Sequence, residues 1–293
     1  MARNKNIMFC LCMLTLAACA TGTASHYNRG VEYYEKGRLP EAINEYKHAI
    51  QTDPKHLHPR FNLAVIYQDQ GKLEEAVQLY QSILDIDPQY GPAWVNLASI
   101  EEKQGKFDAA EKSFKRAGEV DKDDASSLSQ YGYFLLRRHR LDDARKAFRE
   151  ALSRSDSSAN AHYGLGLIAS EQGKQAEALE HFENAIRYNP SDLGAHLKAV
   201  DILIVEGKRA RAIKLLRSAS TLDPNRWETF LQLGRLLGQE GKWKESEKAV
   251  EQALDLGAPK AECYRELGGI YRQLTEEASR ACEHQERKPE QVF

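Results

Sequence analysis

Histidine is the residue type in this sequence whose spacing first invites a search for metal binding or catalysis. His56 and His58 stand two residues apart at the start of a predicted helix, so we expect their side chains to point in different directions. His162 and His196 are 34 residues apart, on predicted neighbouring helices separated by about 10 Å. A single metal needs ligands at about 2 Å, so this pair cannot share one. No His-Glu-x-x-His, Gly-x-Ser-x-Gly, Cys-x-x-Cys or glycine-rich phosphate loop occurs. We therefore predict a protein that is not an enzyme, with no catalytic residue, metal site, cofactor or small-molecule substrate.

Cysteine offers a different chemistry at the N-terminus. Arg3 and Lys5 precede an apolar run over residues 7–14, and Leu-Ala-Ala then leads directly into Cys19. This order of basic, apolar and small residues is that of a signal peptide. Ending in cysteine, it resembles the bacterial lipobox, which implies that residues 1–18 are removed and that the Cys19 thiol is acylated. A transmembrane anchor or an ordinary secretory signal are the alternatives, although the apolar run is short for a membrane span.

The lipobox resemblance also implies a location. Ala20 stands where an inner-membrane retention signal would place aspartate, which favours the outer membrane, with the remaining chain in the periplasm; the inner membrane stays open. Residues 19–26 would be the acylated cysteine and a short tether. Loss of residues 1–18 removes two basic and no acidic residues, so the net charge changes from −2 to −4. Such an anchor carries several acyl chains, so membrane attachment should be stable.

Two further cysteines remain after cleavage. Cys263 and Cys282 would lie on the two helices of a C-terminal hairpin, at places that are not opposite each other. A disulfide needs Cα atoms within about 7 Å. Two buried or partly buried thiols are therefore the simpler interpretation, although an oxidising compartment would permit a bond.

A 34-residue repeat must position all of these side chains. Its most regular feature is a glycine followed by a basic residue, with His139-Arg140 in the place of one such pair: Gly37-Arg38, Gly71-Lys72, Gly105-Lys106, Gly173-Lys174, Gly207-Lys208 and Gly241-Lys242. Glycine can adopt the left-handed conformation that ends a helix. Small residues recur at three places in the repeat: 7 positions before this glycine, 5 positions after it and 12 positions after it. Large apolar residues recur 9 positions after the glycine. The period and these residues predict paired helices that stack on neighbouring pairs.

The repeat resembles the tetratricopeptide repeat, with seven full copies over residues 23–260. Residues 261–293 would form a partial eighth repeat, a capping helix and a frayed tail. The resemblance implies an all-α fold, a right-handed superhelical solenoid of helix-turn-helix repeats with a period of 34. Apolar residues make up 42% and charged residues 29% of the chain, and no long linker interrupts it, so we expect one repeat domain. A net charge of −2 gives no footprint for nucleic acid.

The resemblance also implies a partner-binding groove lined by the first helix of each repeat. In the first three repeats we expect the groove to contain Tyr27, Asn28, Tyr34, Phe61, Asn62, Gln68 and Asn96. The asparagines could bind an extended peptide backbone while the aromatic rings hold its side chains. Equally, asparagine is a common residue at this place in such repeats. The Lys and Asn of the carboxylate clamp that grips chaperone C-termini are absent.

The middle of the expected groove is apolar. Gln130, Tyr133, Leu136, Tyr163 and Leu167 would form its floor, which is typical of a contact site. Arginines and lysines near two of the turns, such as Arg137, Arg138 and Arg140, could attract an acidic partner. A solvated edge that offsets the helix dipoles is the simpler interpretation.

A second resemblance suggests a function. Tyr131, Gly132, Phe134 and Leu135 match the Tyr-Gly-x-Phe-Leu segment of the type IV pilus biogenesis and stability lipoproteins, which assist assembly of the outer-membrane secretin pore. Ser129 and Gln130 replace that family's Asn pair, and Leu136 replaces its cysteine. The resemblance implies a lipid-anchored scaffold that holds a secretin segment. The alternatives are an adaptor lipoprotein for peptidoglycan hydrolases or proteases, or a structural subunit of an outer-membrane export machine.

Overall fold

The computed structural model describes residues 24–120 and 125–286, and throughout these ranges the regular secondary structure is α-helical, with no strand. The predicted all-α fold is therefore confirmed. The chain divides into two compact units, residues 1–156 and 157–293, where the sequence suggested one continuous repeat domain. The predicted signal peptide, Cys19 and most of the tether lie outside the described residues.

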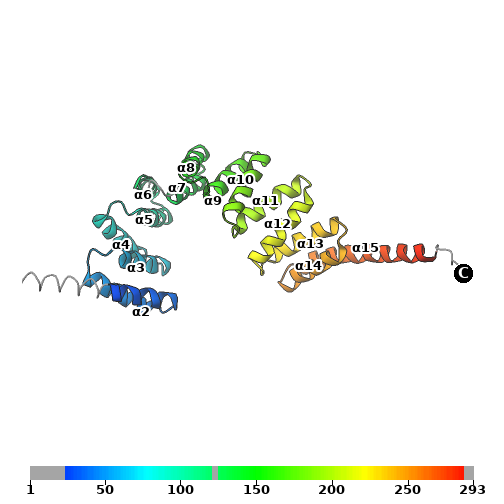
Figure 1. Cartoon of the computed structure of the whole chain (residues 1–293), viewed down its shortest axis with the longest axis horizontal. Helices are drawn as coiled ribbons and strands as arrows, with labels where there is room; N and C mark the ends of the chain where they lie inside the picture. Colours follow the sequence, from blue (N-terminus) through cyan, green and yellow to red (C-terminus); the bar gives the residue numbers. More distant parts are fainter. Residues whose placement is uncertain (1–23, 121–124, 287–293) are drawn as a thin grey trace, which may run out of the picture. The chain divides into compact units, whose positions relative to one another are not determined.

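Unit one consists of four helical hairpins (Figure 1). We call the first helix of each hairpin the A helix and the second the B helix. The A helices are residues 24–35, α3 (Leu57–Asp69), α5 (Gly91–Lys103) and α7 (Ala125–Arg137). The B helices are α2 (Leu39–Thr52), α4 (Leu73–Ile86), α6 (Phe107–Val120) and α8 (Leu141–Arg154).

Unit two continues the same alternation (Figure 1). Its A helices are α9 (Ala159–Glu171), α11 (Leu193–Val205), α13 (Trp227–Gln239) and α15 (Lys260–Glu286). Its B helices are α10 (Gln175–Tyr188), α12 (Arg209–Leu222) and α14 (Trp243–Asp255).

The turn between the helices of each hairpin has the predicted conformation. All six predicted turn glycines have φ between 70° and 75°, and His139 takes their place with φ 57°. The residue after the turn donates its backbone N–H back to the A helix, as from Arg140 to the Leu135 carbonyl at 3.0 Å. This is the hydrogen bond of a left-handed helix C-cap. The turn of the fourth hairpin therefore contains a histidine in the left-handed conformation. This conformation is less favourable for a residue with a side chain than for glycine.

The hairpins are held together by a large B-helix side chain that packs into a notch on the A helix. A methyl group on Gly132 would lie 2.6 Å from the Phe148 ring, and one on Gly166 would lie 2.6 Å from the Phe182 ring. Only a residue without a side chain permits this approach. The same large residues also reach the next hairpin, since the Phe114 and Phe134 ring centroids are 5.2 Å apart. One side chain thus contributes to both interfaces predicted from the repeat.

The eighth repeat differs from the prediction. The cysteine spacing assumed two helices, but α15 runs without a break for 27 residues, from Lys260 to Glu286. No glycine stands at the expected turn, where Thr275 continues the helix. At about 1.5 Å per residue, Cα atoms of residues 263 and 282 are about 28 Å apart along such a helix, far beyond the reach of a disulfide. Cys263 is a buried free thiol.

Candidate functional site

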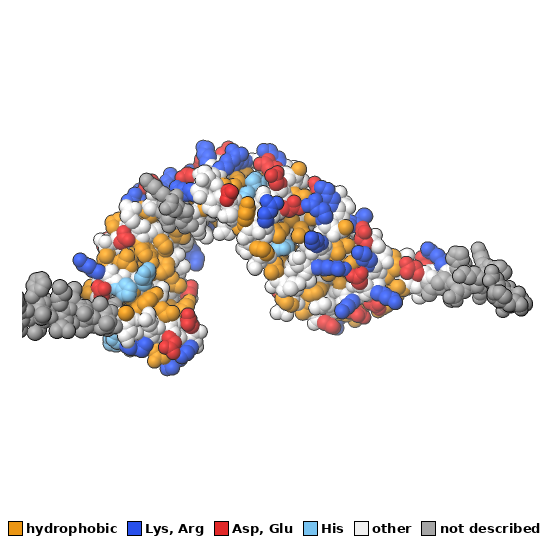
Figure 2. Space-filling model, viewed as in Figure 1, with side chains coloured by type: hydrophobic (Ala, Val, Ile, Leu, Met, Phe, Trp, Pro, Cys, Tyr) orange, Lys and Arg blue, Asp and Glu red, His pale blue; other side chains and the backbone are white. Residues whose placement is uncertain are grey.

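An aromatic and histidine cluster lies beside the A helices of unit one. We use the name aromatic–histidine cluster for Tyr27, His56, His58, Phe61 and Tyr90. Its ring centroids form a chain: Tyr27 is 5.4 Å from His56, His56 is 5.8 Å from His58, and His58 is 6.3 Å from Tyr90. Tyr90 is in turn 5.6 Å from Phe61. Figure 2 shows pale-blue histidine side chains among orange apolar ones in this part of unit one.

The prediction that His56 and His58 point in different directions was wrong. His56 is the N-cap residue of α3 and has an extended backbone, with φ −71° and ψ 112°. The 100° step between helical residues therefore does not relate the two side chains, and both rings turn toward Tyr27. Tyr90 is the N-cap of α5 and reaches the cluster in the same way. His56 and Tyr90 each stand immediately before an A helix, and this position in the sequence could have identified them as members of the cluster.

The cluster is anchored on one side and open on the other. Phe61 packs against the buried Tyr80 ring at 5.8 Å, and Tyr27 packs against Tyr46 at 6.2 Å. All members except the exposed His58 are half-buried. Burial, followed by the electrostatic effect of His58, lowers the pKa of His56 and so favours the neutral imidazole. The result is a pre-positioned aromatic surface that suits apolar or aromatic side chains of a partner.

The asparagines predicted for the groove contribute to the packing between repeats. Asn62 donates a hydrogen bond from Nδ2 to the Tyr46 hydroxyl at 3.3 Å, and Asn96 donates one to Tyr80 at 3.0 Å. The Tyr80 hydroxyl donates in turn to Gln68 Oε1 at 3.3 Å. Each bond joins the A helix of one repeat to the B helix of the repeat before it. Asn62 and Asn96 therefore have a packing role between repeats.

The pairing explains where these asparagines occur. Tyrosine stands at this place in the B helix in the first two repeats only, and asparagine follows 16 residues later in both cases. In the third repeat the residue is Phe114, which has no hydroxyl, and Gln130 follows it. Asn28 lies in the first described helix and is exposed, as is Tyr34. These two remain candidates for partner contact.

The segment that resembles the pilus lipoproteins belongs mostly to the core. Phe134 and Leu135 are each 1% exposed, and Gly132 forms the notch for Phe148. The Tyr131 hydroxyl donates to Glu111 at 3.0 Å, on the preceding B helix. These four residues are explained by packing between helices, so the match does not by itself indicate a partner contact.

Tyr133 and Leu136 of that segment are half-buried, as is Tyr131. The Tyr133 ring stands edge-on to the Phe148 ring, with centroids 5.1 Å apart. In unit two, Tyr163 packs on Phe182 at 5.6 Å, and Leu167 packs against the core of its own unit. The four side chains belong to two different units, so a joint apolar floor stays a prediction.

The basic residues near the α7–α8 turn are bound to neighbouring residues. Arg137 makes two hydrogen bonds to Glu102, at 2.7 and 2.6 Å. Arg138 lies over the Phe107 ring, 3.8 Å from its centroid. Both contacts join α7 or its turn to the third repeat. In unit two, Arg211 pairs with Glu183 of the preceding repeat. These arginines connect adjacent repeats. Because Arg137 and Arg211 are paired with glutamates, less of their positive charge is available to attract an acidic partner.

Arg140 takes part in the most connected ion-pair network of unit one. It bonds Glu111 of α6 at 2.7 Å and Asp143 of α8 at 2.8 Å. Glu111 also accepts from Lys115 at 2.9 Å and from Tyr131. Burial raises the pKa of Glu111, but the hydrogen bonds from Lys115, Arg140 and Tyr131 outweigh it and bring the pKa to about 2.

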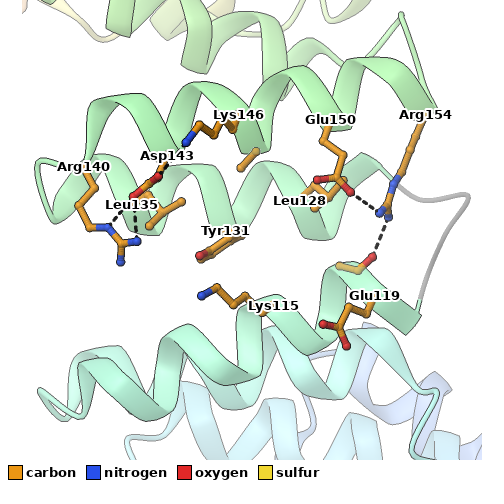
Figure 3. A pocket seen from close by; sticks show the side chains of 12 residues that line it. Lys115, Glu119, Leu128, Tyr131, Leu135, Arg140, Asp143, Lys146, Glu150 and Arg154 are labelled. Carbon is orange, nitrogen blue, oxygen red and sulfur yellow. Dashed lines mark hydrogen bonds and ion pairs between the residues drawn. The ribbon is translucent and has the colours of Figure 1, made fainter.

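A hollow of about 370 Å³ lies beside this network, between α6 and α8 (Figure 3). Leu128, Tyr131 and Leu135 of α7 line its base. The charged residues around it form ion pairs, as Arg154 does with Glu150 at 2.9 Å and Lys115 does with Glu111 at 2.9 Å. A similar hollow of about 410 Å³ lies between α2 and α4. The recurrence indicates a furrow between successive B helices, not a dedicated ligand site.

The two histidines that share a repeat position are packing residues. His162 is buried and stacks on Tyr188, with centroids 5.6 Å apart. His196 is 3% exposed, and its Nδ1 lies 2.8 Å from the Asp192 carbonyl. Across residues 24–120 and 125–286, no three His, Cys, Asp or Glu side chains are grouped to hold a metal ion. In the same residues, no helix is long and apolar enough to span a membrane.

The repeat geometry agrees with a comparison against known families. Residues 11–268 match the model of a tetratricopeptide family described as the Cilia and flagella-associated protein 70 C-terminal domain. The chain belongs to this family. Tetratricopeptide domains typically serve as non-catalytic scaffolds for protein–protein interaction, and this chain is a protein-interaction scaffold of the tetratricopeptide type. No curated protein matches the sequence.

Several solved structures share the fold. A tetratricopeptide repeat protein from Parabacteroides merdae is 20% identical, with TM-score 0.55, over 86% of this chain and 99% of its own. PilF of Pseudomonas aeruginosa is 22% identical, with TM-score 0.60, over 71% and 95%. PilW, described as a widely conserved type IV pilus biogenesis factor, is 18% identical, with TM-score 0.55, over 73% and 98%. At these identities the similarity shows the fold alone.

Proposed function

We infer that this protein is an outer-membrane lipoprotein that holds a segment of a partner protein on its A helices and assists assembly of a secretin pore in type IV pilus biogenesis. The lipobox resemblance at Cys19 supports the anchor and the periplasmic location. The fold similarity to PilF and PilW supports the pilus role.

The aromatic–histidine cluster is the observation that carries the binding role. Its rings are held in place by Tyr46 and Tyr80 and present their other side outward. A surface ordered before binding loses little side-chain entropy when a partner docks. Aromatic side chains arranged along stacked A helices suit an extended segment whose apolar side chains insert between the rings.

An adaptor for peptidoglycan hydrolases or proteases is the second candidate. It is favoured by the finding that Tyr131, Gly132, Phe134 and Leu135 are explained by packing. Without these residues the sequence resemblance that singles out the pilus lipoproteins loses much of its weight. The anchor and the cluster serve either role equally well.

Partner capture from a detergent-solubilised envelope, followed by mass spectrometry, separates the two functions. The bait is the full chain from residue 20 onward. Recovery of a secretin supports the pilus role, whereas recovery of wall hydrolases or proteases without a secretin would replace it with the adaptor role.

The binding surface is tested with the double variant His58→Ala and Tyr90→Ala. We expect it to lose partner capture while keeping helical circular dichroism, because both side chains lie at or before helix N-termini. Phe107→Ala is the matched control. Phe107 is an exposed aromatic of the same unit, at the start of a B helix, and its loss should leave capture unchanged. Equal capture by the wild type and the double variant would rule out this surface.

A further inference from the structure

Two acidic residues lie at the C-terminal ends of the A helices that carry the aromatic–histidine cluster. Glu35 stands eight residues after Tyr27, and Asp69 stands eight residues after Phe61. At about 1.5 Å per residue, each acid is about 12 Å from the cluster residue of its own helix. Both acidic residues are exposed. We call Glu35 and Asp69 the acidic edge.

The acidic edge acts on the surface that carries the cluster. Burial raises the pKa of the Tyr46 hydroxyl, and the charge of Glu35 adds a smaller increase. In the same way, burial and then the charge of Asp69 raise the pKa of Tyr80. These two tyrosines hold the cluster rings in place. The field of each carboxylate therefore reaches the surface on which a partner segment would lie.

The charge of the acidic edge is available to a partner. In the described part of the chain, neither of its carboxylates has an ion-pair partner. The bases of the two turns that follow interact with other side chains: Lys36 with Glu32, Arg38 with Glu41, and Lys72 with the Tyr67 ring. In the third repeat the equivalent residue is Lys103. The acidic edge is therefore confined to the first two repeats.

The two sides of this surface suit different side chains. The cluster rings suit apolar or aromatic side chains, whereas the acidic edge attracts lysine and arginine. Tyr34 is 43% exposed and directly precedes Glu35, so its ring can contact the same basic side chain. In an extended segment, successive side chains point in opposite directions. A segment lying across the stacked A helices would therefore direct alternate side chains to the cluster and to the acidic edge.

We propose that the partner segment is extended and alternates basic with apolar residues, its apolar side chains contacting the aromatic–histidine cluster and its basic ones the acidic edge. This inference rests on the proposed function, because it assigns a chemistry to the segment that the A helices would hold. It goes further by giving that segment a positive charge, which the rings alone do not require.

Fluorescence anisotropy of the chain from residue 20 onward tests the charge of the segment. The probes are a labelled peptide of alternating leucine and lysine, and two matched peptides with glutamine or glutamate in place of lysine. At about 0.1 M salt, we expect the lysine peptide to bind about tenfold more tightly than the glutamine peptide, and the glutamate peptide to bind least. A wild type that binds none of them, or binds the lysine and glutamine peptides equally, would overturn the inference.

Two double variants with the same change of net charge locate the contact. Glu35→Gln with Asp69→Asn should remove most of the preference for lysine over glutamine. Glu74→Gln with Asp85→Asn removes two exposed acids from the B helix α4 and should change binding of the lysine peptide less than twofold. Equal weakening by both double variants would mean that the peptide responds to net charge alone, which would also overturn the inference.

Failure of this inference is distinguishable from failure of the binding surface itself. If the aromatic–histidine cluster is not the binding surface, His58→Ala with Tyr90→Ala leaves the binding of every peptide unchanged. If only the charge assignment is wrong, the same variant weakens binding of all the peptides, while the wild type shows no preference for lysine.

Discussion

Glu111 offers the sharpest test of how adjacent repeats are coupled in unit one. Its carboxylate accepts hydrogen bonds from Lys115 on its own helix, from Tyr131 on α7 and from Arg140 at the turn that follows α7. We expect Glu111→Gln to destabilise the protein at neutral pH, because glutamine keeps the shape but removes the charge that these donors surround.

The magnitude follows from the pKa of Glu111. A decrease from the ordinary 4.5 to about 2 corresponds to roughly 3 kcal/mol of stabilisation of the folded state. The partners Arg140 and Lys115 are 41% and 55% exposed, so solvent screening reduces this figure. We therefore expect a loss of about 1–2 kcal/mol.

The sign of the pH dependence is fixed by the direction of the change. The folded pKa lies below the unfolded one, so the stabilisation is fully present above pH 4.5 and is lost as the pH falls from 4.5 toward 2. At about pH 3 more than half of it should be gone. The difference between wild type and Glu111→Gln should shrink accordingly.

Urea unfolding at pH 7 and at about pH 3, followed by circular dichroism, measures both differences. Hydrogen exchange of α6 and α7 locates the effect, because repeat arrays need not unfold in one step. Glu119→Gln is the control on the same helix. Glu119 is 66% exposed and pairs with Arg116 at 3.1 Å, so its change should be below about 0.5 kcal/mol. Equal destabilisation by Glu111→Gln at both pH values would refute the reasoning.

Three further predictions concern the turn, the packing between repeats and the anchor. His139→Gly should stabilise unit one by about 0.5–1 kcal/mol in thermal unfolding, because glycine relieves the left-handed strain and loses part of the gain to chain entropy; a lower melting temperature would contradict this. Tyr80→Phe and Asn96→Ala should show a coupling of about 0.5–1.5 kcal/mol in a double-mutant cycle, and additive effects would mean that their hydrogen bond contributes nothing. Cys19→Ala should release the protein from membranes in a carbonate wash, and a variant that stays bound would exclude the lipid anchor.

The architecture could be predicted because each repeat is defined by local requirements. The turn needs a residue in the left-handed conformation, and the A helix needs a small residue where a large B-helix side chain packs. The spacing of Gly132 and Phe148 within the repeat is therefore enough to predict that they pack together. The departure at α15 also has a sequence signal, since no glycine stands near Thr275. The predicted hairpin assumed that the repeat would persist without its turn residue.

The candidate site was less predictable because its contacts join different repeats. The hydroxyl that binds Asn96 lies 16 residues earlier, on Tyr80, and the partner of Arg137 lies 35 residues earlier, on Glu102. Neither pairing follows from the positions within a single repeat. The direction of the His56 side chain was predicted wrongly because the prediction assumed helical geometry, whereas His56 is an N-cap residue with an extended backbone.

The chain of neighbour contacts has a consequence for the order in which the protein forms. Among the described residues of each unit, the extensive helix–helix contacts join a helix to the next helix or to the one after it, as α5 contacts α6 and α7. Contacts so close in sequence form quickly and do not wait for distant segments. A chain that emerges from a ribosome or a translocation channel with its N-terminus first can therefore complete each hairpin before the next has appeared. The arginine and asparagine bridges between adjacent repeats can then form as each repeat is added.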